Sequence, residues 1–234
     1  MFLIPDLLET PVGVARVVWE GPQEEGLLVL GHGVGGGIDA ADLLAARDAA
    51  LAVGLGVVRV EQPWRVRGRR VAESPVRLDA AWCAVLAAVT ARASVQAGVL
   101  VVGGRSSGAR VACRTAVDVG AAAVLALAFP LHPPGRPERS RLPELLLPDL
   151  PRLVVQGERD PFGLPEPGPG LEVSVVRGAD HGFGVRRRDG RSSAEVAQEV
   201  RDVVARWLRI VTAPPPEGQP PPAGQPPPAG QTLT

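Results

Sequence analysis

The segment Gly104-Arg-Ser-Ser-Gly108 carries the strongest chemical signal in this sequence of 234 residues. It is a Gly-x-Ser-x-Gly pattern centred on Ser106, with the apolar run 99–102 before it and a helix-prone segment after it. In a strand–turn–helix context, such a turn holds the serine in a strained backbone conformation and exposes its hydroxyl. A side chain at either flanking position would collide with the neighbouring strand and helix, so both glycines are required. The pattern predicts a nucleophile at Ser106.

A serine nucleophile needs a base that takes its proton and a carboxylate that orients the base. In folds that present the serine on such a turn, the acid follows the serine in the chain and the histidine comes last. The sequence has three histidines, and His32 and His132 both precede the acid candidates. His181 lies in the glycine-rich segment 178–184, before the predicted last helix. We therefore predict that His181 is the base, the alternative being an ordinary surface-loop histidine.

Three aspartates compete for the role of the acid. Asp160 follows the apolar run 153–155 and a glycine, and Pro161 comes next, so a strand would deliver its carboxylate at the strand's carboxyl end. Asp180 is adjacent to His181, and neighbours in sequence rarely face each other productively. Asp149 is the third candidate. We favour Asp160.

Acyl transfer also needs N–H donors for the oxyanion of the tetrahedral intermediate. One is the backbone N–H of Ser107, the residue after the nucleophile. The second is expected from the glycine-rich segment 31–37, where we assign it to Val34, with Gly33 as the next candidate. A phosphate-binding role for these glycines is disfavoured because the spacing is not Gly-x-Gly-x-x-Gly and the chain has no lysine for a P-loop.

Several further polar residues are candidates for contact with a substrate. They are His32, Arg105 and His132. His32 is expected to make structural hydrogen bonds rather than to act as a catalyst. Arg105, beside the nucleophile, would either bind an acidic substrate group or, as we favour, form a salt bridge or point into solvent. Arg136, Arg139 and Arg141 follow a predicted strand, and substrate charge is not inferred from them.

The elements that position these residues alternate between strands and helices, which predicts an α/β fold with a mainly parallel sheet covered on both faces. Strands are predicted at Val12–Trp19, Leu27–Gly31, Val57–Glu61, Val99–Val102, Ala122–Phe129, Leu153–Gln156 and Leu171–Val176. One helix is predicted from Asp39 to about Val53, and a second begins at Ser74. A third follows the Gly-x-Ser-x-Gly turn, and the last runs from a capping box at Ser192–Glu195 to about Ile210.

The composition excludes several classes of protein. The 25 arginines balance 25 acidic residues, so neither nucleic acid nor an acidic membrane surface is an implied partner. Two cysteines, Cys83 and Cys113, indicate neither a disulfide framework nor a metal site. The amino terminus does not resemble a signal peptide, and the longest apolar stretch, 119–131, is too short to span a bilayer. We expect a soluble cytoplasmic protein without a cofactor.

The domain organisation follows from a change of composition near the carboxyl terminus. Residues 1–212 are expected to form one domain, and residues 213–234 a disordered tail that contains two copies of Pro-Pro-Pro-Ala-Gly-Gln. Proline blocks both helix formation and strand pairing, and nothing in the tail can form a core. The tail is either a neutral appendage, which we favour, or a weak docking segment for a partner.

Five motifs together resemble a family of small α/β hydrolases related to dienelactone hydrolase. The motifs are residues 31–37, 103–110, 129–137, 156–163 and 179–181. Animal members of the family include a testis-expressed protein and a subunit of a histone-acetyltransferase complex. The resemblance implies an α/β-hydrolase fold with a minimal lid or none, and a triad of Ser106, Asp160 and His181. Dienelactone hydrolase itself has a cysteine nucleophile, whereas this turn has serine.

The expected activity is that of a serine hydrolase. It would cleave a small ester or thioester through an acyl-enzyme, and its partner would be a small-molecule substrate. The alternative is a catalytically silent, hydrolase-like protein that uses its surface or its proline-rich tail for binding.

Overall fold

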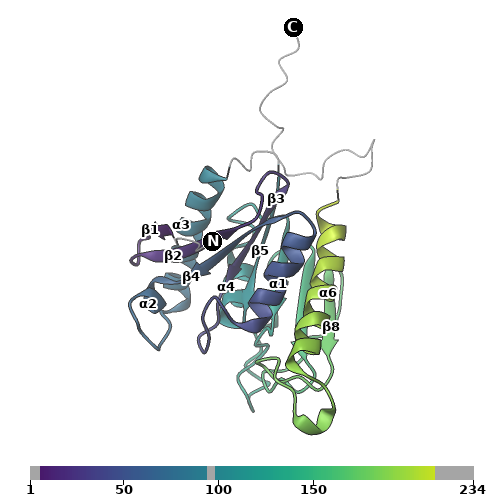
Figure 1. Cartoon of the computed structure of the whole chain (residues 1–234). Coiled ribbons are helices and arrows are strands. Elements are labelled where there is room, and N and C mark those ends of the chain that lie inside the picture. Colours follow the sequence, from purple (N-terminus) through teal and green to yellow (C-terminus); the bar gives the residue numbers. More distant parts are fainter. Residues whose placement is uncertain (1–5, 94–97, 214–234) are drawn as a thin grey trace.

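An eight-stranded sheet runs through the protein in the computed structural model, which describes residues 6–93 and 98–213 (Figure 1). The strands are β1 (Asp6–Leu8), β2 (Ala15–Glu20), β3 (Gly26–Gly31), β4 (Gly56–Glu61), β5 (Val99–Arg105), β6 (Ala123–Leu127), β7 (Arg152–Gly157) and β8 (Leu171–Val176). Their order in the sheet is β1-β2-β4-β3-β5-β6-β7-β8. The six strands from β4 to β8 in this order are parallel, and β2 pairs antiparallel with both of its neighbours. The predicted α/β class is confirmed.

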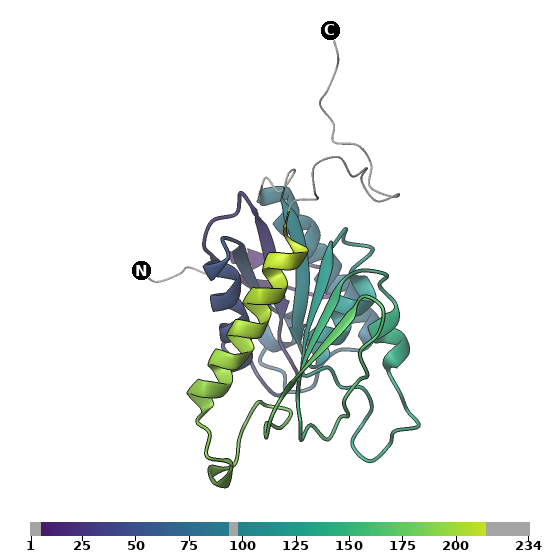
Figure 2. The same cartoon turned by 90° about the vertical axis from the view of Figure 1, so that its right-hand side faces the viewer.

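Helices cover both faces of this sheet. They are α1 (Ala41–Ala52), α2 (Pro63–Val66), α3 (Pro75–Arg92), α4 (Ser107–Thr115), α5 (Leu142–Leu146) and α6 (Ser193–Val211), with a short 3₁₀ turn, η1 (Arg187–Asp189). Helices α1 and α6 lie side by side over one face, where Figure 2 shows α6 running along the sheet. Helices α3 and α4 pack on the opposite face.

Apolar periodicity explains this arrangement. Every residue of β3, β4, β6 and β7 is buried, as expected for parallel strands covered on both faces. The predicted apolar stripe of α3 is buried against the sheet and comprises Leu78, Trp82, Val85, Leu86 and Val89. On the other face, α6 buries Val196, Val200, Val204, Trp207 and Leu208. Each large apolar side chain buried in this way contributes about 1.5–3 kcal/mol.

The structure corrects several predicted boundaries. The first predicted strand does not begin at Val12, because residues 11–13 form a turn in which Thr10 Oγ1 donates a hydrogen bond to the Gly13 carbonyl oxygen. Strand β1 and the short helices α2 and α5 were not predicted. Helix α1 begins at Ala41, since the Asp39 side chain accepts a hydrogen bond from Arg59 at 2.5 Å instead of capping the helix.

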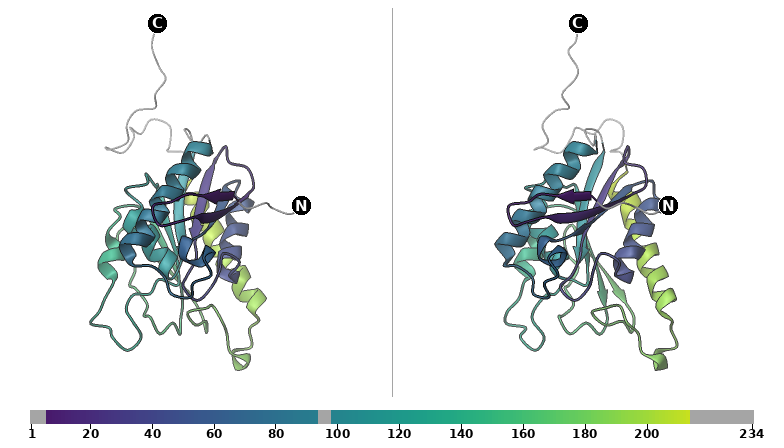
Figure 3. Two further views of the ribbon diagram at one scale, coloured as in Figure 1. Left: turned by 90° about the vertical axis from the view of Figure 1, so that its left-hand side faces the viewer. Right: turned by 60° about the vertical axis from the view of Figure 1, so that its left-hand side comes forward.

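The loops that follow the parallel strands gather at the lower end of the molecule in Figure 1. Figure 3 shows β1 and β2 at one edge of the sheet, away from these loops. Within residues 6–93 and 98–213, no helix combines the length and the apolar character needed to cross a bilayer. The predicted tail lies outside the described residues from position 214 onward, so the domain boundary stays a prediction.

Candidate active site

Ser106 occupies the sharp turn between β5 and α4. Its backbone angles are φ 52° and ψ −110°, a region in which a residue with a side chain is strained by about 1–3 kcal/mol. The Ser106 N–H donates to the carbonyl oxygen of Leu127 on β6 at 2.9 Å. The surrounding sheet thus holds the strained residue in place.

The two glycines of the turn are sterically required, as predicted. A Cβ atom at Gly104 or at Gly108 would lie 2.4 Å from the carbonyl oxygen of Gly31 on β3. Real Cβ atoms do not approach a backbone oxygen so closely, and the backbone of a buried strand cannot move aside. Strand β3 and helix α4 can therefore meet only through glycine.

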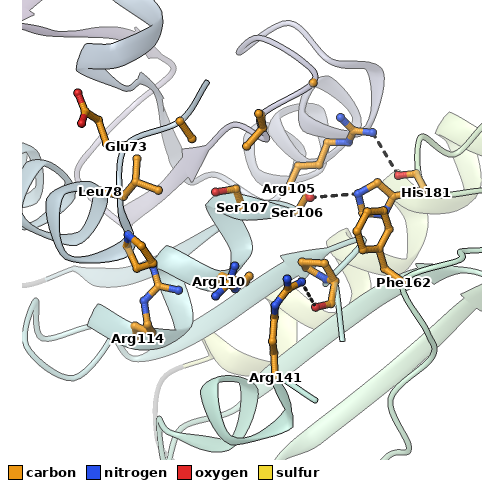
Figure 4. Close-up of a pocket in the computed structure, with 15 residues that line it drawn as sticks. Glu73, Leu78, Arg105, Ser106, Ser107, Arg110, Arg114, Arg141, Phe162 and His181 are labelled. Atoms are coloured by element: carbon orange, nitrogen blue, oxygen red, sulfur yellow. Dashed lines mark hydrogen bonds between the residues drawn. The ribbon is translucent and has the colours of Figure 1, made fainter. Parts of the chain in front are cut away.

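Three side chains that are distant in sequence form a continuous hydrogen-bonded chain (Figure 4). The Ser106 hydroxyl lies 3.0 Å from Nε2 of His181, and Nδ1 of His181 lies 2.8 Å from Oδ2 of Asp160. Asp160 follows β7, and His181 belongs to the loop between β8 and α6. The structure therefore brings the favoured nucleophile, base and acid together.

The two competing aspartates lie elsewhere. Asp180 Oδ1 accepts the backbone N–H groups of Gly182 and Gly184, at 2.8 and 2.9 Å, and so stabilises its own loop. Asp149 is exposed in the segment before β7. Neither carboxylate bonds to His181.

The carboxylate of Asp160 is oriented by two donors besides His181. The backbone N–H of Phe162 donates to Oδ1 at 2.9 Å, and Nε2 of Gln156 donates to Oδ2 at 2.8 Å. Gln156 is fully buried, and its Nε2 also lies 3.0 and 2.9 Å from the carbonyl oxygens of Phe129 and Gly163, so its two N–H groups are shared among three acceptors. The sequence analysis did not single out Gln156, although an amide at the end of the apolar run 153–155 is a signal that could have found it.

The two residues predicted to donate to the oxyanion, Ser107 and Val34, lie on the turn and on the glycine-rich loop. Ser107 is the first residue of α4, so its N–H has no acceptor within the helix. A Cβ atom at Gly33 would lie 3.3 Å from the Cβ atom of Ser106, so the loop passes directly beside the nucleophile. Val34 is 39% exposed and lines the adjacent pocket. This arrangement is compatible with the donors predicted from the sequence.

His32 makes structural hydrogen bonds beneath this loop. Its Nε2 accepts the N–H of Gln62 at 3.1 Å, so Nδ1 carries the proton and donates to the carbonyl oxygen of Gly33 at 2.8 Å. Burial lowers the pKa of His32, which keeps the ring neutral and preserves this tautomer. His32 does not line the pocket beside Ser106.

Arg105 forms a buried ion pair, one of the alternatives considered from the sequence. Its Nε lies 2.9 Å from Oδ2 of Asp42 on α1, and the two side chains are 14% and 3% exposed. Burial raises the pKa of Asp42, and the charge of Arg105 opposes this effect. Arg105 also donates from Nη2 to the carbonyl oxygen of His181 at 3.1 Å. Its charge is thus used within the protein.

A pocket of about 490 Å³ opens beside Ser106 and His181. Its apolar lining includes Leu78, Pro130 and Phe162, and the Phe162 ring lies 4.3 Å from the His181 ring between centroids. The lining also includes four arginines, which Figure 4 shows around the cavity: Arg105, Arg110, Arg114 and Arg141. A cavity of this size fits a small organic molecule. His132 does not line it and bonds through Nδ1 to the Pro133 carbonyl oxygen at 2.9 Å.

Neither cysteine takes part in this site. Cys113 is buried on α4, and burial raises the pKa of its thiol to about 12. Cys83 is partly exposed on α3, and neither residue lines the pocket. Over the described ranges, 6–93 and 98–213, no group of three His, Cys, Asp or Glu side chains is arranged to hold a metal ion.

Comparison with known proteins places this fold among the α/β hydrolases. A family model described as an alpha/beta hydrolase domain matches residues 24–209. A solved serine hydrolase homologue from Coxiella burnetii has 22% identity and a TM-score of 0.69 over 89% of this chain and 98% of that one. A serine hydrolase without a lid from Xanthomonas campestris has 19% identity and a TM-score of 0.66, over 88% and 94% of the two chains.

Dienelactone hydrolase from Anabaena variabilis is also similar in structure. It has 15% identity and a TM-score of 0.68, with 89% of this chain and 97% of that one covered. No curated protein matches the sequence significantly. The resemblance to α/β hydrolases inferred from the motifs is confirmed: the fold is similar to that of dienelactone hydrolase, and the chain belongs to the α/β hydrolase domain family.

Proposed function

We propose that this protein is a serine hydrolase that cleaves a small ester or thioester through an acyl-enzyme. The observation that carries the proposal is the chain of hydrogen bonds from Ser106 through His181 to Asp160, at 3.0 and 2.8 Å. Ser106, at one end of this series of hydrogen bonds, lines a pocket large enough for a small substrate. The dienelactone hydrolase and serine hydrolases of similar structure support esters as the first substrates to test.

In the acylation step, Ser106 Oγ attacks the substrate carbonyl carbon while His181 Nε2 takes the hydroxyl proton. The carbonyl oxygen becomes an oxyanion, which the N–H groups of Ser107 and Val34 stabilise. The intermediate collapses, the bond to the leaving group breaks, and His181 returns the proton to the departing alcohol or thiol. Asp160 stabilises the imidazolium that exists between the two proton transfers.

In the deacylation step, water replaces the departed alcohol or thiol. His181 removes a proton from the water, which attacks the acyl carbon and forms a second oxyanion at the same donors. Collapse of this intermediate breaks the bond to Ser106 Oγ, and His181 gives the proton back to the serine. The products are a carboxylic acid and the free enzyme.

Labelling with a fluorophosphonate probe tests this proposal, because the probe reacts covalently with an activated serine. We expect the folded wild-type protein to be labelled and Ser106→Ala to remain unlabelled. Ser193→Ala, at an exposed position at the start of α6, is a matched control that should be labelled like the wild type. Absence of labelling in the folded wild-type protein would instead favour the catalytically silent alternative.

A further inference from the structure

One wall of the pocket is built from arginines, and two of these are neutralised by carboxylates. Arg110 on α4 donates two hydrogen bonds to Glu144 on α5, at 2.9 and 2.7 Å. Arg114, one turn further along α4, donates to Glu144 at 2.7 Å and makes two bonds to Asp79, at 2.8 and 2.6 Å. These groups form a closed network of paired charges.

Arg141 lines the same wall but does not belong to this network of ion pairs. Its side chain donates a hydrogen bond from Nη1 to the carbonyl oxygen of Pro130 at 3.0 Å. In the part of the chain that the structure describes, no carboxylate lies within 4.0 Å of its guanidinium. Figure 4 shows Arg141 extending from the loop before α5 toward Ser106. Burial and the nearby positive charge of Arg110 lower the pKa of Arg141, and the negative charge of Glu144 opposes this effect without forming an ion pair.

The other charged residues of the pocket have partners. Arg105 is paired with Asp42. Glu73 is bound by Arg67 at 2.7 Å and by Arg77 at 2.9 Å. Among the described residues, Arg141 is therefore the one arginine of the pocket lining that forms no ion pair with a carboxylate. A half-buried cation without an ion-pair partner attracts an anion, because solvent screens the interaction less there than at an open surface.

We propose that Arg141 binds a carboxylate of the substrate, so that the substrate is an ester or thioester with a second, ionised carboxyl group. This inference rests on the proposed hydrolase function and specifies its substrate class. A guanidinium has five N–H donors in a planar fork, and the bond to Pro130 uses one of them. The remaining donors suit the two oxygens of a carboxylate. A monoanion matches the single uncompensated charge better than a phosphate dianion does.

The first test compares four esters, two with a carboxylate and two neutral counterparts, by their kcat/KM values. Mono-4-nitrophenyl glutarate carries the carboxylate on the acyl side, and 3-carboxyphenyl 5-methylhexanoate carries it on the alcohol side. In 4-nitrophenyl 5-methylhexanoate, an isopropyl group replaces the acyl carboxylate of the first ester. We expect wild-type protein to prefer one carboxylate ester over its neutral counterpart (for the alcohol-side ester, phenyl 5-methylhexanoate). The preferred ester shows which side of the substrate carries the carboxylate.

The variant Arg141→Gln removes the charge and keeps a polar side chain. We expect it to lower the ratio of kcat/KM values for the preferred charged ester over its neutral counterpart by about 10- to 100-fold, the size expected for a hydrogen bond to a charged group. Arg139→Gln removes a charge from the exposed part of the same loop and should leave the ratio unchanged. A disturbed loop would lower turnover of the charged and neutral esters alike, and so would not change the ratio.

A binding measurement separates this inference from the proposed function. In Ser106→Ala protein, we would measure by calorimetry the binding of amide analogues of the same four esters, with nitrogen in place of the ester oxygen. Binding of a carboxylate analogue about 10- to 100-fold more tightly than its neutral analogue, with the preference lost on adding Arg141→Gln, supports the inference even if wild-type protein has no esterase activity. Equal binding of charged and neutral analogues, or a preference that survives Arg141→Gln, overturns it even if the wild type is an active esterase.

Discussion

Arg105 donates from Nη2 to the backbone carbonyl oxygen of His181 across 3.1 Å, and thereby joins the turn that carries Ser106 to the loop that carries the imidazole. The same guanidinium forms an ion pair with the buried Asp42 of α1. A Cβ atom at Gly36 would lie 3.2 Å from Nη1 of Arg105, so the glycine-rich loop also packs against it. One side chain thus connects three parts of the candidate site.

We predict that Arg105 is a positioning residue for His181. Arg105→Met should lower kcat by about 10- to 100-fold and change KM less, because misplacing the base affects the transition state more than substrate binding. It should also lower the free energy of unfolding by about 3–5 kcal/mol, since Asp42 is left buried without its partner. Steady-state kinetics and urea unfolding measure the two effects.

The double variant Arg105→Met/Asp42→Leu separates these two effects. Removing both buried charges should restore most of the lost stability, because a buried ion pair contributes little more than an apolar pair of similar volume. The value of kcat should stay low, since nothing then holds the carbonyl of His181. Recovery of wild-type kcat in the double variant would show that Arg105 acts only through stability.

Replacing members of the proposed triad should abolish most of the activity. Ser106→Ala and Asp160→Asn are each expected to lower kcat by roughly 10⁴-fold with the fold intact, because the first removes the nucleophile and the second removes the charge that stabilises the imidazolium. Circular dichroism would check the fold of both variants. Combining Ser106→Ala with His181→Ala should cost little more than Ser106→Ala alone, as the two residues act as a unit. Turnover at the wild-type level in either single variant would refute the assignment.

His32 should make stability depend on pH. Because burial lowers its pKa, the unfolded chain binds a proton at pH values where the folded protein keeps the ring neutral. The contribution of His32 to stability is therefore fully present above about pH 6.5, the usual pKa of histidine, and declines as the pH falls below it. We expect the difference in unfolding free energy between wild type and His32→Gln to shrink between pH 7.5 and 5.5. Urea titrations would measure it, and a constant difference would contradict the prediction.

Thiol reagents should not inhibit the proposed activity. Burial raises the pKa of Cys113 to about 12, so this thiol is both inaccessible and protonated at neutral pH. Cys83 lies on α3 away from the pocket lining. N-ethylmaleimide at pH 7.5 should leave fluorophosphonate labelling intact, and mass spectrometry should find Cys113 modified only after denaturation. Loss of labelling with the reagent would point to a cysteine in the reaction.

The sequence by itself determined the features that depend on local spacing. The strand, the Gly-x-Ser-x-Gly turn and the following helix could be predicted because two glycines and an apolar run are local signals. The chain order of Ser106, Asp160 and His181 was readable for the same reason, as each follows a recognisable strand. The ends of helices were harder to predict where a side chain had two possible partners. Asp39 could have capped α1, but its side chain binds Arg59 instead.

Only the tertiary structure decided which charges are paired. Asp42 and Arg105 lie on different elements, and nothing in either segment indicates the other as its partner. Likewise, the sequence contains Arg110, Arg114 and Arg141 as equivalent arginines, but packing of α4 against α5 gives the first two carboxylate partners and leaves the third facing the pocket. The physical reason is that secondary structure follows from neighbours along the chain, whereas pairing of side chains depends on distances set by the packing of whole elements.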